Sequence, residues 1–258
     1  MKKVSLPATS KRVRPRASIA AVARKPAARR RMTRDERAAQ IMAGAISFFA
    51  EHGIEGQTRD LASRLGVTHA LLYRYFPTKQ ALIERVYHEV FLGRWKDEWE
   101  VLLADSRLSF AERVELFYLD YARVILNKDA VRIFVFSGLT HSTIPKRFLT
   151  RIVDRIFIPL MREMRAMLKL PGLDTIPATD AEKEMLWHLH GGIFYIGIRH
   201  WIYGLPFPVD LDEAVRVRTD GYVSAAPGIV RAAVMRASPP SRKSPMPGTS
   251  SRRRAGPR

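Results

Sequence analysis

The sequence has no cysteine among its 258 residues, and this absence removes several classes of protein. Without a thiol the chain has no disulfide framework and no thiolate chemistry, and a structural zinc site is not expected. The richest apolar run, GGIFYIGIRHWIYGLPF, is interrupted by Arg199 and His200, so no run approaches the roughly 20 apolar residues that span a bilayer. The first thirty residues also lack the apolar segment of a secretory signal. We therefore expect a cytoplasmic protein with no membrane partner.

Motifs that support catalysis or cofactor binding are also missing. The sequence shows no glycine-rich phosphate loop, internal repeat, paired-carboxylate motif or nucleophile motif. His188 and His190 are two positions apart and point to different faces of a helix, so they do not form a metal site together. His141 and His200 are isolated, and we interpret them as core or rim residues. The sequence therefore predicts no enzyme, no cofactor and no metal.

Acidic residues are absent from both ends of the chain. Residues 1–31 contain eleven lysines or arginines and residues 236–258 contain seven, which together account for nearly all of the net charge of +19. Neither end shows apolar periodicity, and this composition predicts disordered basic tails. Such tails strengthen non-specific attraction to DNA by counterion release. The alternatives are solvated tails without a role or, for the first segment, a true start at Met32.

The middle of the chain shows apolar residues at helical spacing, with 47% hydrophobic residues overall and no alternating strand pattern. Residues 129–140 are apolar nearly all round, so a short buried helix is expected there and a strand is not excluded. Pro159 predicts a kink about one turn earlier in its helix. The predicted helices run from Thr33 to about His52, from Thr78 through Trp95 toward Trp99, from Ser109 past Ile125, over 129–140, from Pro145 to Leu168, over 180–203 and over 211–235.

Capping motifs support three of these starts. Ser109 with Glu112, Thr179 with Glu182, and Asp210 with Glu213 each have the spacing of a capping box. The helix over 180–203 also contains Gly191, Gly192 and Gly197, and each glycine costs about 1 kcal/mol relative to alanine in a helix interior. Close approach of a second helix explains such a cost. We therefore expect the helices near 180–203 and 211–235 to form a homodimer interface, with packing inside one core as the alternative.

The stretch from Thr58 to Lys79, TRDLASRLGVTHALLYRYFPTK, predicts two short helices and a tight turn. Thr58 is expected to cap the first helix, and Gly66 ends it. Thr68 caps the second helix, which stops before Pro77 because the residue preceding a proline is pushed out of the α region. Two short helices joined by a glycine-containing turn make a helix-turn-helix, in which the second helix enters the DNA major groove.

The side chains of the second helix sort into two faces by their angular spacing. Leu72, Tyr75 and Phe76 fall on the side that packs against the first helix. His69, Ala70, Tyr73 and Arg74 fall on the side that faces a groove. Arginine pairs with guanine edges or phosphates, histidine with base edges and a tyrosine hydroxyl with the backbone, while Ala70 and Leu71 can touch a thymine methyl. On spacing alone, an ordinary helical corner with a solvated basic face fits equally well.

Three pieces of residues 34–80 follow a known pattern: IMAGAISFFAEHGIEGQT, RDLASRLGVTHALLYRYF and PTKQAL. The run GVTHALLYRYFPTK resembles the turn, recognition helix, aromatic pair and following lysine of the TetR family of bacterial transcriptional regulators. Ala70 and Leu71 depart from that family's usual glycine or proline followed by threonine, so the resemblance does not give the base-contact pattern. The resemblance implies phosphate or backbone contacts from Thr58, Arg59, Tyr73, Tyr75 and Lys79, and groove contacts from Thr68, His69, Ala70 and Leu71, to which the face described above adds Arg74.

The expected protein is all-α, with about nine helices in two domains. Residues 1–31 and 236–258 are the basic tails, residues 32–80 the helix-turn-helix domain, and residues 81–235 the effector-binding and dimerisation domain. The resemblance implies a repressor of the bacterial cytoplasm that binds a near-palindromic double-stranded operator as a homodimer and is released by a small, largely apolar effector. The alternative is a nucleoid-type accessory protein whose basic tails bind DNA without sequence preference.

Overall fold

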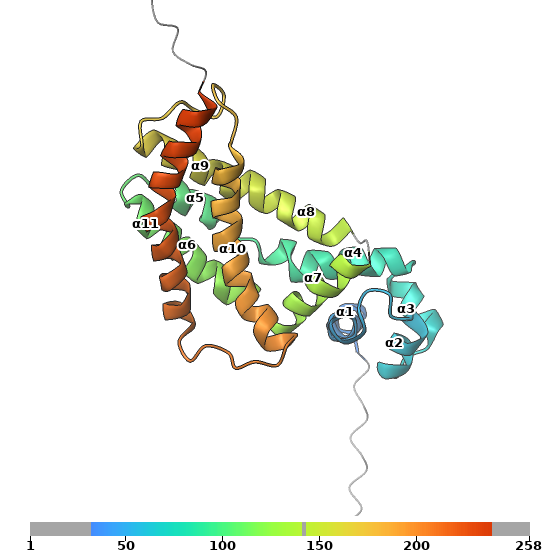
Figure 1. Ribbon diagram of the computed structural model, residues 1–258. Helices are drawn as coiled ribbons and strands as arrows, with labels where there is room; N and C mark the ends of the chain where they lie inside the picture. The colour runs from blue at the N-terminus through green and yellow to red at the C-terminus, as the bar shows by residue number, and fades with distance from the viewer. Residues whose placement is uncertain (1–31, 141–142, 239–258) are drawn as a thin grey trace, which may run out of the picture.

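The computed structural model describes residues 32–140 and 143–238 of the chain. Within these residues every regular element is a helix, which confirms the all-α prediction (Figure 1). The first predicted basic tail, residues 239–258 of the second and His141 lie outside the described residues. The predicted start of the second tail at residue 236 is wrong, because α11 continues to Ala237.

The first four helices form one end of the molecule (Figure 1). They are α1 (Arg34–His52), α2 (Thr58–Arg64), α3 (His69–Tyr75) and α4 (Lys79–Val90). Helix α1 begins as predicted, because Thr33 and Glu36 form a reciprocal capping box. It ends at Gly53, whose φ of +75° suits a residue without a side chain. The predicted apolar face of α1 is buried and includes Ile41, Ala45 and Phe49, each with no exposed area.

Helix α4 ends earlier than the sequence predicted. It stops at Val90, and a 3₁₀ turn (Leu92–Arg94) separates it from α5 (Glu98–Ala104). The predicted continuous helix to Trp99 is therefore wrong. Gly93 weakens the helix at this point, and Asp120 stabilises the new direction of the chain by accepting hydrogen bonds from Lys96 Nζ at 2.6 Å and Trp99 Nε1 at 2.7 Å.

The remaining helices form the body of the molecule. Ser109 and Glu112 form the expected capping box, and so do Thr179 and Glu182. Asp210 caps the last helix by accepting from the Glu213 backbone N–H at 2.9 Å. Residues 129–140, for which the sequence allowed either a helix or a strand, are helical as far as Leu139. The body helices are α6 (Phe110–Ile125), α7 (Lys128–Leu139), α8 (Thr143–Ile152), α9 (Ile158–Met167), α10 (Asp180–Trp201) and α11 (Leu211–Ala237).

At the position of the kink predicted before Pro159, the structure has a π-helical turn. Residues Val153–Phe157 are π-helical and join α8 directly to α9. Proline lacks the N–H that an α-helical ladder needs at this position. The wider turn accommodates that gap without ending the helix, and Ile156 and Phe157 remain buried.

A buried ion pair holds the loop between α9 and α10. The Arg165 guanidinium donates to both Glu182 carboxylate oxygens at 2.7 Å, and only 1% of each side chain is exposed. The same guanidinium donates to the backbone carbonyls of Pro171, Gly172, Ile176 and Pro177. Burial alone raises the pKa of Glu182, but hydrogen bonds from Arg165 and Thr179 hold it below its ordinary value.

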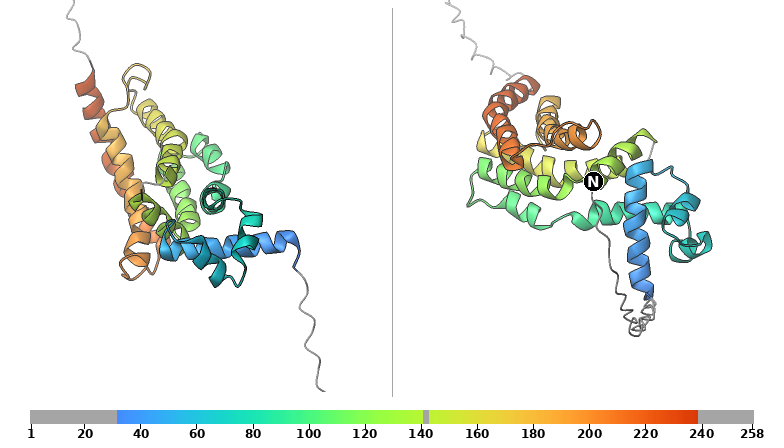
Figure 2. Two further views of the ribbon diagram at one scale, coloured as in Figure 1. Left: turned by 90° about the vertical axis from the view of Figure 1, so that its right-hand side faces the viewer. Right: turned by 90° about the horizontal axis from the view of Figure 1, so that it is seen from below.

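Helices α10 and α11 lie side by side along the flank of the body in all three views (Figures 1 and 2). The three glycines of α10 have different surroundings. A Cβ on Gly197 would lie 2.8 Å from Val131 Cγ2 of α7, so packing inside one core, and not a dimer contact, accounts for this glycine. The Gly192 carbonyl accepts from Arg218 Nε at 3.0 Å. Gly191 faces open space, with no atom within 4 Å of a built Cβ.

Candidate nucleic-acid interface

Helices α2 and α3 form the predicted helix-turn-helix. Gly66 ends α2 with a φ of +63°, and the Val67 N–H bonds back to the Ala62 carbonyl at 3.0 Å. Thr68 caps α3, because its hydroxyl accepts from the Leu71 N–H at 3.1 Å. Leu61 and Leu72 are almost fully buried between the two helices. The local sequence therefore fixes both the turn and the direction of α3.

The prediction that Thr58 caps α2 is wrong. Gln57 occupies the N-cap position of α2, and Thr58 is the first helical residue. Its hydroxyl lies 3.1 Å from His69 Nε2 and 3.1 Å from the Tyr73 hydroxyl, both on α3. The His69 and Tyr73 rings pack edge to face at 4.7 Å. Thr58 therefore orients two side chains of α3 across the turn, a contact that spacing within α2 does not reveal.

The outward face of α3 has the composition that the angular spacing predicted. Ala70 and Arg74 are exposed, while His69, Leu71 and Tyr73 are half-buried. Among the described residues Arg74 has no ion-pair or hydrogen-bond partner. Such an exposed guanidinium on the predicted groove face is available for a phosphate or a guanine edge.

The inward face also follows the prediction, and the flanking cations lie at the ends of neighbouring helices. Leu72 is buried, and Tyr75 and Phe76 pack against the core while remaining half-buried. Arg59 is exposed in the first turn of α2. Lys79 begins α4, with its Nζ 4.0 Å from Glu55 Oε2. Thr68 is exposed at the start of α3, so the predicted site residues gather around α3.

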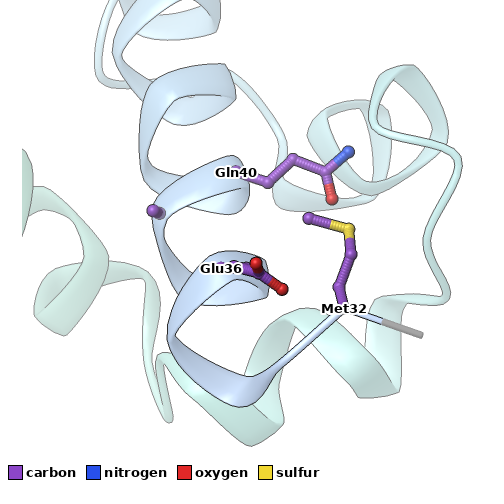
Figure 3. A pocket seen from close by; sticks show the side chains of 4 residues that line it. Met32, Glu36 and Gln40 are labelled. Carbon is purple, nitrogen blue, oxygen red and sulfur yellow. The ribbon is translucent and has the colours of Figure 1, made fainter. Parts of the chain in front are cut away.

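A surface hollow lies along the first half of α1 and is lined by Met32, Glu36, Ala39 and Gln40 (Figure 3). The Met32 and Gln40 side chains extend toward one another across it (Figure 3). The hollow is formed by one helix and its leading residue, so it lacks the converging polar groups of a binding site.

The described residues contain no group of three or more potential metal ligands. None of the described helices is long and apolar enough to cross a membrane.

His190 of α10 is buried among aromatic rings of the body. Its Nε2 lies 3.4 Å from the Tyr121 hydroxyl, while its Nδ1 has no partner among the described residues. The Tyr118 hydroxyl is also buried, and no described residue forms a hydrogen bond with it. The rings of Phe157 and Trp187 lie 5.7 and 6.1 Å from the imidazole. Burial lowers the pKa of His190 to about 4, so the imidazole is neutral at pH 7.

This neutral histidine should make the stability of the fold depend on pH. The unfolded imidazole takes up a proton near pH 6.5 and the folded one only near pH 4, so stability is complete above 6.5 and falls as the pH drops toward 4. We expect His190→Leu to remove about 2 kcal/mol of the stability loss that the wild type shows between pH 7 and pH 5. Urea unfolding at several pH values measures this difference. His188→Leu, at an exposed position two residues away, is the matched control; equal pH slopes in both variants would contradict the assignment.

The braced pair of helices, with an exposed basic face on the second, defines a DNA-binding helix-turn-helix protein. Residues 41–86 match the family described as bacterial regulatory proteins, tetR family. This segment of the chain is therefore similar to the DNA-binding part of the TetR family, and the resemblance predicted from the helix-turn-helix sequence is confirmed over these residues.

Two known proteins show the extent of the similarity. A 92-residue stretch is 33% identical to the Escherichia coli tetracycline repressor protein class A from transposon 1721, covering 33% of this chain and 42% of that repressor. The chain thus spans less than half the length of this curated relative. The crystal structure of a TetR family transcriptional regulator from Pseudomonas syringae pv. tomato superposes with a TM-score of 0.50 at 15% identity, covering 75% of this chain and 97% of that one. At this identity the match shows the shared fold.

Proposed function

We propose that the chain is a transcriptional repressor of the bacterial cytoplasm that binds a near-palindromic operator as a homodimer. The observation that carries this proposal is the exposed face of α3, on which Arg74 lies near Ala70 and has no partner in the part of the chain that the structure describes. A recognition helix of this kind enters the major groove, and two copies read half-sites about one helical turn or a multiple of it apart.

The DNA contacts divide by chemistry. Arg74 and His69 offer donors for base edges, and Ala70 and Leu71 offer apolar contact to a thymine methyl. Phosphate contacts come from groups around the rim of α3, which fix orientation without reading sequence. The rim groups are Arg59, Thr68, Tyr73, Tyr75 and Lys79. Thr58 acts through its bonds to His69 and Tyr73, in addition to any contact of its own.

The homodimer interface that we propose is the outer face of α10 and α11. Large apolar side chains are exposed there, including Tyr195 at 47%, Val217 at 60% and Met235 at 66%. A Cβ on Gly191 or Gly221 would meet no atom within 4 Å, so another helix can approach closely at these positions. Exposed apolar side chains beside small residues are typical of a subunit contact. Light scattering of the full chain should give twice the mass of one chain, and two chains for each bound operator duplex; a single chain on the duplex would contradict the proposal.

The effector that we propose is small, largely apolar and uncharged. The core around His190 supports this class, because its imidazole is neutral and neither His190 Nδ1 nor the Tyr118 hydroxyl has a hydrogen-bond partner within residues 32–140 and 143–238. An apolar molecule with one hydroxyl or carbonyl group can satisfy such atoms, whereas a charged one loses its hydration. The groove between α5 and α9 suits an apolar ligand less well, since its lining includes Glu100, Asp154 and Arg162.

The effector class predicts a specific ligand preference. A medium-chain alcohol should raise the melting temperature of the full chain, because a ligand that binds only the folded state stabilises it. The carboxylate of the same chain length should leave the melting temperature unchanged, because its charge would be buried without a counter-ion. Differential scanning fluorimetry measures both ligands. A larger increase with the carboxylate would contradict an uncharged effector. By linkage, an effector that weakens DNA binding is itself bound more weakly on DNA.

A second candidate function is a nucleoid-type accessory protein. The observation that favours it is the charge distribution, since eighteen lysines and arginines lie at the two ends of the chain. Binding through such tails ignores sequence and weakens steeply with salt. Sequence preference at near-physiological salt therefore separates the two candidates.

A further inference from the structure

Arg132 of α7 connects two helices that are far apart in the sequence. Its Nε donates to the Ala50 carbonyl of α1 at 2.6 Å, and its Nη1 donates to the Trp201 carbonyl of α10 at 3.1 Å. The guanidinium lies over the Phe136 ring, 4.9 Å from its centroid. One side chain of the body thus holds the DNA-binding end and the last turn of a proposed dimer helix.

Both acceptors are carbonyls that a helix cannot satisfy internally. Ala50 lies in the last turn of α1, and Trp201 is the last residue of α10. The C-terminal end of a helix carries partial negative charge, which a cation stabilises. Arginine suits this position because its planar fork presents donors in two fixed directions. Lysine keeps the charge but offers one compact group.

The surrounding contacts show that α7 packs against both α1 and α10. A Cβ on Gly53, at the end of α1, would lie 3.6 Å from Phe136 Cβ of α7. Gly197 of α10 has no room for a side chain against Val131 of α7. Figure 1 shows α7 running between the lower end of α10 and α1. Arg132 therefore lies at the place where three helices converge.

The DNA-binding end needs a second attachment to have a fixed orientation. Its first attachment is α4, where Phe91 packs against Phe134 and Phe148 at ring distances of 6.1 and 5.2 Å. With α4 as the only attachment, rotation about α4 would be unrestrained. The packing of α1 against α7 and the bond from Arg132 to the Ala50 carbonyl of α1 both restrain that rotation. The bond from Arg132 to the Trp201 carbonyl links the DNA-binding end to α10 of the proposed dimer face.

We propose that Arg132 is a positioning residue that fixes the angle of each DNA-binding end relative to the dimer face and thereby sets the half-site spacing that the protein accepts. The inference rests on the proposed function, because spacing matters only when two DNA-binding ends engage one operator. Each inserted base pair moves one half-site by about 3.4 Å along the axis and rotates it around the duplex. A rigid pair of DNA-binding ends rejects such a shift, and a loosely held pair tolerates it.

The test is a spacing profile measured for the full chain. Synthetic duplexes carry the same two half-sites with zero, one or two base pairs inserted or removed between them. We expect the wild type to lose about tenfold in affinity or more when one base pair is inserted, and Arg132→Met to lose less than about threefold relative to its own best duplex. Arg155→Met, which removes an exposed body arginine paired with Glu100, should keep the wild-type profile.

Each outcome decides the matter. An unchanged profile in Arg132→Met would overturn the positioning role and leave the proposed function intact, because a purely structural clamp changes overall affinity or stability but not the ratio between duplexes. Should Arg132→Met fail to fold by circular dichroism, Arg132→Lys is measured in its place, with the same expectation of a flattened profile. A wild type that shows no preference for paired half-sites would overturn both this inference and the proposed function.

Discussion

Replacing Arg165 with methionine is expected to lower the free energy of unfolding by about 3–5 kcal/mol. The substitution keeps most of the side-chain length but leaves the Glu182 carboxylate buried, and among the described residues only Thr179 still donates hydrogen bonds to it. It also removes the donor for four backbone carbonyls of the loop between α9 and α10. The measurement is urea denaturation of the full chain followed by circular dichroism at pH 7.

Arg155→Met is the matched control for this effect. Arg155 and Glu100 form a comparable pair at 2.9 Å, but 55% of the arginine side chain is exposed. Exposed pairs contribute about 0–1 kcal/mol, so the control should change little. Similar losses in the two variants would show that burial does not set the importance of the Arg165 pair. The stability that the Arg165–Glu182 pair gives the folded protein should also be lost as the pH falls through the lowered pKa of folded Glu182. Protonation removes the negative charge that Arg165 stabilises.

Replacing both Tyr73 and Arg74 with alanine should abolish specific DNA binding while leaving the helical dimer intact. A good base contact contributes about 1–3 kcal/mol, so loss of Arg74 together with the Tyr73 hydroxyl should weaken operator binding by about 100-fold or more. Both side chains lie on the outward side of α3, and neither is fully buried. Fluorescence anisotropy with the enriched duplex and with a scrambled duplex measures the ratio of specific to non-specific affinity.

Arg162→Ala provides the charge-matched control, because this arginine is exposed on α9 of the body. It should bind the enriched duplex as the wild type does. Circular dichroism and light scattering verify that the double variant remains folded and associated. Selection of the same site by the double variant would mean that another element reads the DNA.

The parts of the fold that the sequence predicted correctly depend on interactions between near neighbours in the chain. The caps at Thr68, Ser109 and Thr179 each join groups three residues apart, so their spacing is visible in the sequence. The π-helical turn lies where the sequence predicted a kink, because the N–H of Pro159 is missing. Short-range chemistry of this kind reads directly from sequence.

The parts that the sequence did not predict depend on contacts between distant residues. The bonds of Arg132 join positions 82 and 69 residues apart, and nothing near Arg132 marks it as different from other arginines. The end of α4 depends on Asp120 drawing in Lys96 and Trp99 from another helix. Such contacts exist only after the helices have packed.

The candidate site lies between these two cases. The outward face of α3 was predictable, because helical geometry fixes which side chains share a face. The link from Thr58 to His69 and Tyr73 was not predictable, because it spans 11 and 15 residues across the turn. Tertiary packing therefore changes the role of a residue whose participation the resemblance had implied.

The most direct test of the central claim is selection of DNA by the full chain. Duplexes with a randomised central region are incubated with the protein at near-physiological salt and excess competitor DNA, and the bound fraction is sequenced. The repressor proposal predicts enrichment of one short near-palindrome, whose enrichment is lost in the Tyr73→Ala, Arg74→Ala double variant. Binding without any enriched sequence, and with an affinity that falls steeply as salt is raised, would contradict it and favour the accessory-protein alternative.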